Sequence, residues 1–248
     1  MRPPPGRPWV IAHRGASAAF PENTAAAFRG AAAQGADAVE LDVRRTADGE
    51  AVVHHDAALP GLGAIVEQRA ADLRLRCPWV PTLAEALAAC RGMWVDVEVK
   101  NSPADPDWDP ADTLVARVVA LIREEGRRQE VLLTSFNPAT LARARSLEPA
   151  LPTGWLVEDA APALPACLAA AAAAGHTALL PWAPTLAGES AAALAAAARE
   201  AGVSLIAWTV DDPGEARRLA AAGLSGIITN QPARLLAALG EHHHHDRG

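Results

Sequence analysis

Several residue types are scarce in this sequence, and each scarcity limits what the protein can be. Among its 248 residues there is no tyrosine, and there are only three phenylalanines, three cysteines and one lysine. The cysteines are few, odd in number and widely spaced, so the sequence predicts neither a disulfide framework nor a zinc motif. No apolar run is long enough for a signal peptide or a membrane span. We therefore expect a cytoplasmic protein with no stable membrane insertion.

The charge balance excludes further classes of partner. The formal net charge is −7 at pH 7 and the pI is about 5.6. This balance argues against general affinity for nucleic acid or for anionic membrane surfaces. Hydrophobic residues make up 50% of the chain, enough for the core of one α/β barrel domain. Nothing in the sequence indicates an oligomeric state.

Strand-like apolar runs alternate with Ala- and Leu-rich helical segments along the whole chain. The strand candidates are Trp9–His13, Ala38–Val43, Met93–Lys100, Val131–Ser135, Thr153–Leu156, Thr177–Leu180, Ser204–Thr209 and Gly226–Thr229. Several helical segments end in glycine, as helices commonly do. Eight near-equal strand–helix units predict an α/β protein with a single (β/α)8 TIM barrel. A doubly wound open sheet is the alternative, but the sequence has no GxGxxG turn.

One unit is longer than the others. Between Val43 and Thr82 lies about one extra unit of chain, which we interpret as a short extended piece (Ala51–His54) followed by loops. Long loops of barrels belong mostly at the C-terminal face, where active sites are built. We therefore predict one barrel domain over residues 1–240 with a loop excursion after the second strand. The HHHH-containing segment 241–248 is expected to be a disordered tail.

Acidic and apolar residues alternate in two neighbouring strand candidates. Glu40 and Asp42 share one strand face, as do Asp96 and Glu98 in the next barrel strand. Helices cover the outside of a barrel, so this face must be the interior or its mouth. Buried carboxylates a few ångströms apart resist ionisation unless a cation lies between them. The pattern predicts a divalent metal site, and hard oxygen ligands suit Mg²⁺ or Ca²⁺. Pairing with arginines such as Arg44 is the alternative.

The only lysine follows this acidic pattern. Lys100 lies two residues after Glu98, whereas arginine fills the 21 other basic positions. A compact ammonium can contact a phosphate or a carboxylate cluster in ways that a planar guanidinium cannot. We therefore expect a functional role for Lys100, with chance retention of one lysine as the alternative.

Histidines and an arginine lie beside the same segments. His13-Arg14-Gly15 ends the first strand candidate, and His54-His55-Asp56 ends the extended piece. Two imidazoles on either side of a scissile bond can serve as base and acid. A surface His-Arg pair is the alternative for the first motif. Strand alternation turns His54 away from its neighbour, so a structural role is the alternative for that residue.

Taken in order, these segments resemble the glycerophosphodiester phosphodiesterase family over nearly the whole chain. The matching motifs are HRGASAAFPENTAAAF (13–28), ELDVRRTADGEAVVHHD (40–56), VEVK (97–100), TSFN (134–137), AWTVDD (207–212) and GIITNQP (226–232). The sequence departs from the family pattern in two places. The segment after His-Asp is Ala57-Ala58-Leu59-Pro60-Gly61, and the excursion before the third barrel strand is short, so that little cap covers the pocket. Both affect the expected leaving group rather than the phosphoryl chemistry.

The resemblance implies a (β/α)8 barrel that hydrolyses glycerophosphodiesters to sn-glycerol 3-phosphate and an alcohol. The implied substrate is a small molecule, and the implied cofactor is a divalent metal ion, Mg²⁺ or Ca²⁺. Sequence alone does not decide which histidine is acid and which is base, or whether water or a substrate hydroxyl attacks. For Trp208, whose implied role is given last below, the alternative is an ordinary packing residue at the top of the barrel. The implied roles are metal ligand for Glu40, Asp42 and Glu98, acid or base for His13 and His55, phosphate contact for Arg14 and Lys100, and aromatic wall beside the glycerol for Trp208.

Two other functions remain open at this point. A lysophospholipase D or cyclising phospholipase on the same barrel would need an apolar surface at the mouth, which Trp79, Trp108 and Trp182 could form. A catalytically inactive binding barrel is the rival from a different class. The presence of all the site residues argues against that rival.

Overall fold

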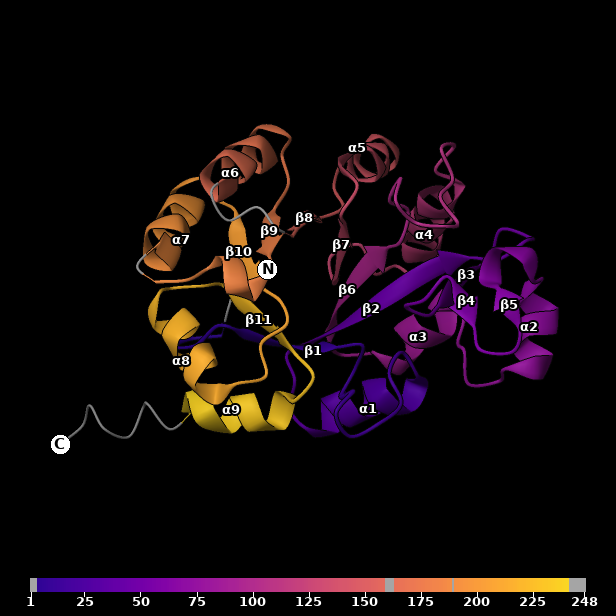
Figure 1. Ribbon diagram of the computed structural model, residues 1–248, viewed down its shortest axis with the longest axis horizontal. Coiled ribbons are helices and arrows are strands. Elements are labelled where there is room, and N and C mark those ends of the chain that lie inside the picture. The colour runs from indigo at the N-terminus through magenta and orange to yellow at the C-terminus, as the bar shows by residue number, and fades with distance from the viewer. Residues whose placement is uncertain (1–3, 159–162, 189, 241–248) are drawn as a thin grey trace.

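The computed structural model describes residues 4–158, 163–188 and 190–240, and within them eight parallel strands close into a barrel (Figure 1). Each strand pairs with its neighbours in the order β1-β11-β10-β9-β8-β7-β6-β2, and the pairing of β1 with β2 closes the ring. The predicted TIM barrel is thereby confirmed. The barrel strands are β1 (Trp9–His13), β2 (Ala38–Arg45), β6 (Trp94–Val99), β7 (Val131–Ser135), β8 (Thr153–Val157), β9 (Ala178–Pro181), β10 (Ser204–Ala207) and β11 (Gly226–Thr229).

Helices surround the barrel and return the chain to the start of the next strand (Figure 1). Several begin at a side chain that accepts a hydrogen bond from a first-turn N–H, as Asn137 and Asp212 do. Thr82 and Glu85 form a capping box at the third helix. The surrounding helices are α1 (Ala25–Ala33), α3 (Leu83–Ala89), α4 (Thr113–Glu124), α5 (Pro138–Leu147), α6 (Leu164–Ala173), α7 (Ser190–Glu200), α8 (Pro213–Ala221) and α9 (Pro232–Gly240).

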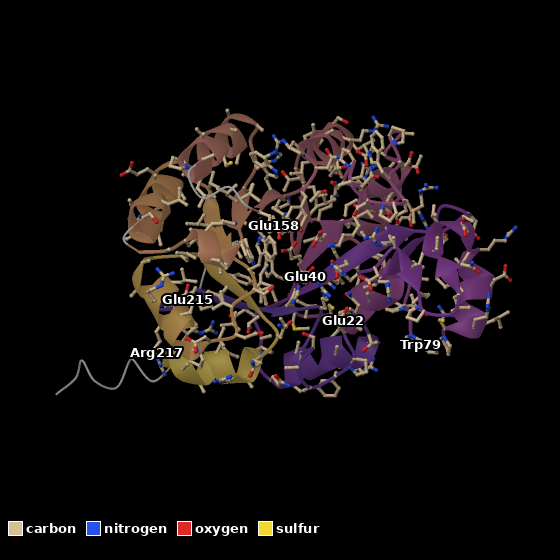
Figure 2. All side chains as sticks on the ribbon, in the orientation of Figure 1. Glu22, Glu40, Trp79, Glu158, Glu215 and Arg217 are labelled. Carbon is tan, nitrogen blue, oxygen red and sulfur yellow. The ribbon has the colours of Figure 1, made fainter. Side chains whose placement is uncertain are left out.

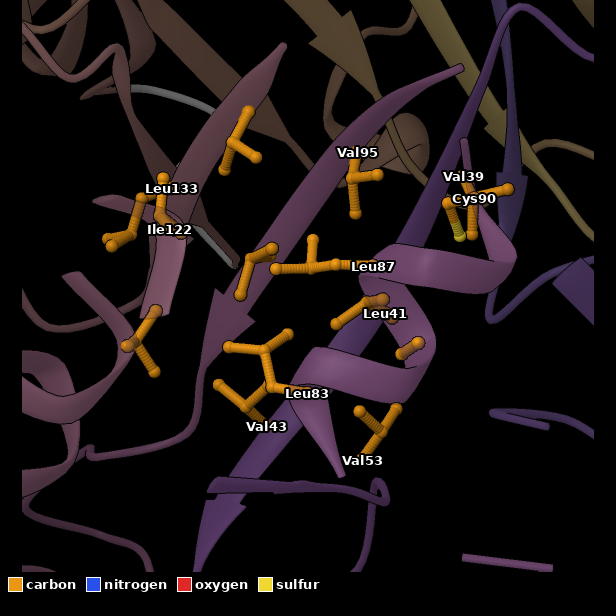
Figure 3. Packing of buried hydrophobic residues seen from close by; sticks show 14 of the residues in the cluster. Val39, Leu41, Val43, Val53, Leu83, Leu87, Cys90, Val95, Ile122 and Leu133 are labelled. Carbon is orange, nitrogen blue, oxygen red and sulfur yellow. The ribbon is translucent and has the colours of Figure 1, made fainter. Parts of the chain in front are cut away.

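The alternation of β2 determines which side chains face the barrel interior. Val39, Leu41 and Val43 pack in one buried cluster with Leu83 and Leu87 of α3 (Figure 3). Successive strand residues point to opposite faces, so Glu40 and Asp42 point the other way, into the barrel. A separate apolar cluster that includes Ile11, Leu132, Leu156, Leu180 and Ile206 contains no helix residue and fills the barrel below them.

The excursion after β2 has more regular structure than the sequence indicated. The predicted extended piece is present as β3 (Ala51–Val53), antiparallel to β2. The loops expected after it instead include a hairpin of β4 (Ala58–Leu59) and β5 (Gly63–Ala64), a 3-10 turn (Ile65–Glu67) and α2 (Ala70–Arg76). A small apolar cluster explains the difference, because its burial stabilises the segment independently of the barrel core. Its buried members are Val52, Leu59, Ile65, Leu73, Cys77 and Val80.

No helix in the described part of the chain has the length and apolar character needed to cross a membrane. The cytoplasmic location stays a prediction. The predicted tail, 241–248, lies outside the described residues.

Candidate functional site

Polar side chains from several strands meet in one cavity of about 220 Å³. Most of them belong to the last residues of a strand or directly follow one, which places the cavity at the C-terminal face of the barrel. The predicted site residues that line it are His13, Arg14, Glu40, His55, Glu98, Lys100 and Trp208. The structure thus brings together seven of the eight predicted residues, and the eighth, Asp42, contacts two of them directly.

Three carboxylates form the centre of the site. Glu40 and Asp42 come from β2 and Glu98 from β6, and one oxygen of each lies within 4.8 Å of the others. Strand register explains this meeting, because Asp42 is the direct β-sheet partner of Glu98. All three residues are buried, with exposed fractions of 3%, 1% and 7% respectively. The cluster has the donor set of a divalent cation site.

Burial and mutual repulsion disturb the ionisation of these carboxyls. Burial, with repulsion from Asp42 and Glu98, raises the pKa of Glu40 well above its ordinary value. Burial likewise raises the pKa of Glu98 to about 7, although Lys100 opposes the shift. Burial acts in the same direction on Asp42, but Lys100 and Arg14 outweigh it and lower the pKa of Asp42. Without a further cation the cluster therefore carries less than three negative charges at neutral pH.

One carboxylate oxygen of Glu40 has no hydrogen-bond donor among the described residues. Glu40 Oε2 accepts from the backbone N–H of Arg14 at 2.9 Å, whereas the buried Oε1 accepts from no described residue. A buried oxygen without a donor is costly unless a cation satisfies it. The observed donor set therefore fits an oxygen-ligated divalent ion.

Two side-chain cations neutralise part of the cluster. Arg14 Nε lies 3.3 Å from Asp42 Oδ2, and its guanidinium also binds Glu22 at 3.0 Å. Lys100 Nζ lies 3.0 Å from Asp42 Oδ1 and 2.7 Å from Glu98 Oε1. Burial lowers the pKa of Lys100, but these two carboxylates outweigh it and raise the pKa overall. Both residues therefore remain charged beside the cavity.

His13 is held by a hydrogen-bond chain that begins at Asp211. Asp211 Oδ2 accepts from Asn230 Nδ2 at 2.6 Å, and Asn230 Oδ1 lies 2.7 Å from His13 Nδ1. A carboxylate can only accept, so the amide nitrogen must face Asp211 and the amide oxygen must face His13. The proton of neutral His13 consequently sits on Nδ1. Its Nε2, 3.9 Å from Glu40 Oε2, presents a lone pair to the cavity.

His55 contacts a carboxylate instead of an amide. Its Nδ1 lies 2.8 Å from Asp56 Oδ1, and its side chain is more exposed than that of His13. Burial lowers the pKa of both histidines, although a hydrogen bond acts in the opposite direction in each case, with Asn230 for His13 and with Asp56 for His55. His54 turns away, as the alternation indicated, and its Nδ1 contacts the backbone oxygen of Asp56.

An aromatic pair forms one wall of the cavity. Trp208 follows β10 and donates from Nε1 to the carbonyl oxygen of Leu180 at 2.8 Å. Its ring meets that of Phe136 edge-to-face, with centroids 5.5 Å apart. By contrast, the tryptophans proposed as an apolar mouth, Trp79, Trp108 and Trp182, are not among the described residues that line this cavity. Trp182 nevertheless follows β9 and forms a β-bridge with Trp208, so the apolar mouth stays a prediction.

Several site residues were not identified from the sequence, although the motifs that contain Asn23, Asn230 and Asp211 were. Asn23 is buried, donates from Nδ2 to Asp42 Oδ2 at 2.8 Å, and adopts a φ of +56° that asparagine tolerates. Asn230 and Asp211 lie in the GIITNQP and AWTVDD motifs, and Glu158 follows β8 at the mouth (Figure 2). A polar residue directly after a barrel strand is the signal that could have found Asn230 and Glu158.

Comparison with known proteins agrees with this architecture. The model of the "Glycerophosphoryl diester phosphodiesterase family" matches residues 13–234. A glycerophosphodiester phosphodiesterase of Caldanaerobacter subterraneus is 30% identical over 166 residues, which cover 60% of this chain and 66% of the relative.

Solved structures match over nearly the full length. A putative glycerophosphoryl diester phosphodiesterase from Silicibacter pomeroyi superposes with a TM-score of 0.85 and 29% identity, covering 98% of this chain and 96% of the other. A phosphodiesterase from Oleispira antarctica, in complex with the product sn-glycerol-3-phosphate, superposes with a TM-score of 0.79 and 26% identity, covering 94% and 97%. The resemblance found in the sequence motifs is confirmed, and this chain belongs to the glycerophosphoryl diester phosphodiesterase family.

Proposed function

We propose that this protein hydrolyses glycerophosphodiesters to sn-glycerol 3-phosphate and an alcohol. Water supplies the oxygen that ends on phosphorus, the bond from phosphorus to the leaving oxygen breaks, and a proton completes the alcohol. The observation that carries the proposal is the convergence of three buried carboxylates, two cations and two histidines on one cavity. Membership of the family and the product found in the Oleispira relative support the substrate class.

Glu40, Asp42 and Glu98 are the proposed ligands of a Mg²⁺ or Ca²⁺ ion. Their oxygens form a hard donor set, and the buried Glu40 Oε1 without a donor fits direct coordination. When bound, such an ion polarises a phosphate oxygen as a Lewis acid. Arg14 and Lys100 flank the same carboxylates and are the proposed contacts for the substrate phosphate.

The two histidines have environments that suit opposite tasks. His13 is more deeply buried and lies beside Arg14, and both effects lower its pKa and favour the uncharged ring, although the hydrogen bond to Asn230 acts in the opposite direction. That hydrogen bond holds the proton of the neutral ring on Nδ1 and leaves Nε2 free. His55 has the carboxylate of Asp56 on Nδ1, which favours the protonated ring. We therefore assign His13 as the base that removes a proton from the attacking hydroxyl and His55 as the acid that protonates the leaving oxygen.

The phospholipase and binding-protein alternatives have less support in the geometry. Trp79 lies in a separate hollow with His54, and Trp108 is 45% exposed. A lysophospholipid would need an apolar surface continuous with the cavity, and neither tryptophan contributes to its described lining. A binding barrel would not require an imidazole with its free nitrogen held toward a carboxylate cluster.

The reaction itself is tested by hydrolysis of a water-soluble glycerophosphodiester with and without a chelator. We expect EDTA to abolish turnover and Mg²⁺ or Ca²⁺ to restore it. Glycerol 3-phosphate released at full rate in EDTA would overturn the metal assignment.

The two histidines are tested by substitution. His13→Ala and His55→Ala should each lower kcat by roughly 10²–10⁴-fold, the usual contribution of a positioned acid or base, while metal binding persists. Near-normal turnover by either variant would overturn that histidine's role.

Asn230 is predicted to act through His13. Asn230→Ala removes the acceptor that holds the Nδ1 proton, so a fraction of the rings will present a protonated Nε2 to the cavity. We expect kcat to fall by a factor on the order of 10, less than the roughly 10²–10⁴ available to the base itself, with metal affinity unchanged. Ser17→Ala is the control, since Ser17 Oγ also donates to Asn230 Oδ1 but leaves the contact with Asp211 intact. Equal losses in both variants would contradict a positioning role.

Lys100→Arg tests the single lysine. The ammonium fits between Asp42 and Glu98 with 11% of its side chain exposed, and a planar fork of larger size will not occupy the same position. We expect a large loss of activity, with a melting temperature close to that of the unaltered protein. Activity like that of the unaltered protein would show that Lys100 is an accident of composition.

A further inference from the structure

A second cavity, which Trp208 does not line, adjoins the first. Its volume is about 260 Å³, and it shares Glu98, Lys100, Phe136 and Glu158 with the first cavity. Lys100, a proposed phosphate contact, therefore stands at the boundary between the two. A diester that binds with its phosphate at Lys100, and with its glycerol against Trp208 as the family resemblance implies, would have the second cavity beside its other alcohol.

Negative charge in this second cavity exceeds positive charge. Glu98, Asp105 and Glu158 line it, and among its described lining residues Lys100 is the only cation. Lys100 is already matched by Asp42 and Glu98. Asp105 accepts from the backbone N–H of Ser102 at 2.8 Å and has Arg44 only at 3.9 Å.

Glu158 contributes the most accessible of these charges. It follows β8 directly, is exposed, and has no hydrogen bond or ion pair with another described residue. Figure 2 shows Glu158 near Glu40, and both residues line the first cavity. Phe136, on the next strand end, adds an aromatic ring to both cavities, and aromatic faces attract cations.

We propose that the second cavity receives the leaving-group alcohol and selects alcohols that carry an ammonium group, of the choline or ethanolamine type, with Glu158 as the main determinant. The inference rests on the proposed hydrolysis of glycerophosphodiesters. The ammonium lies near the Glu158 carboxylate and the Phe136 ring, while the phosphate remains at Lys100. An alcohol of the same shape without charge loses both attractions.

The experiment compares two diesters that differ only in this charge. One is sn-glycero-3-phosphocholine, and the other carries 3,3-dimethylbutanol, in which carbon replaces the quaternary nitrogen. We expect kcat/KM to favour the choline diester by about tenfold, as one partly solvated cation site allows. Glu158→Gln should reduce the ratio to near one by lowering only the choline value, and Glu158→Lys should invert it. Glu200→Gln, at the exposed end of α7, is the matched control and should leave both values unchanged.

The inference can be contradicted by turnover or by binding. Equal kcat/KM values for the two diesters in the unaltered protein would overturn it, as would an equal loss on both diesters in Glu158→Gln. If neither diester is hydrolysed, the proposed function fails. The cation site is then tested separately, by measuring the binding of choline with saturation-transfer NMR. A choline signal that Glu158→Gln abolishes supports the cation site independently of turnover, and an unchanged signal or none refutes it.

Discussion

Three carboxylates buried within 4.8 Å of one another impose the constraint on which the rest of this structure depends. Burial and repulsion both oppose their ionisation. The pKa values of Glu40 and Glu98 remain raised, which shows that the neighbouring cations do not fully offset this electrostatic cost. Arg14 and Lys100 offset another part by approaching Asp42 from two sides. What remains is a site whose donor set fits a divalent ion, and its two cations lie where the proposed function requires contacts for a phosphate.

The barrel makes this arrangement possible because it separates stability from chemistry. The apolar residues of β2 pack outward against α3, and the alternate acidic residues of the same strand point inward. Beneath the acidic cluster, an apolar cluster of strand residues fills the barrel. The groups at the mouth are attached to strand ends whose register is set by many backbone hydrogen bonds. Small changes in leaving-group contacts, such as the contact proposed for Glu158, can therefore occur without loss of the fold.

Local sequence patterns predicted most of this organisation. The eight strands agree with the structure to within one or two residues, because each is a short apolar run between helix ends. The same-face spacing of Glu40 and Asp42, repeated at Glu98, was sufficient to place three carboxylates on neighbouring strands. The single lysine was also located correctly beside them.

What sequence reasoning missed depends on contacts between distant segments. Asn230 reaches His13 across 217 positions, and nothing in its neighbours indicates that Asp211 orients it. The hairpin and α2 of the excursion depend on a small apolar cluster that no single periodic run reveals. The tryptophans were grouped by chemistry rather than by strand position, so Trp79 was assigned to a mouth that its position does not reach.

Location of the ion is the most direct test of the central claim. A crystal of the protein grown with Mn²⁺, which accepts the same oxygen ligands as Mg²⁺, allows its position to be fixed by anomalous scattering. The account predicts one ion bonded to oxygens of Glu40, Asp42 and Glu98 at about 2.0–2.6 Å, with Lys100 beside it. An ion bound elsewhere, or a cluster that stays metal-free with the Lys100 ammonium between Asp42 and Glu98, would contradict it.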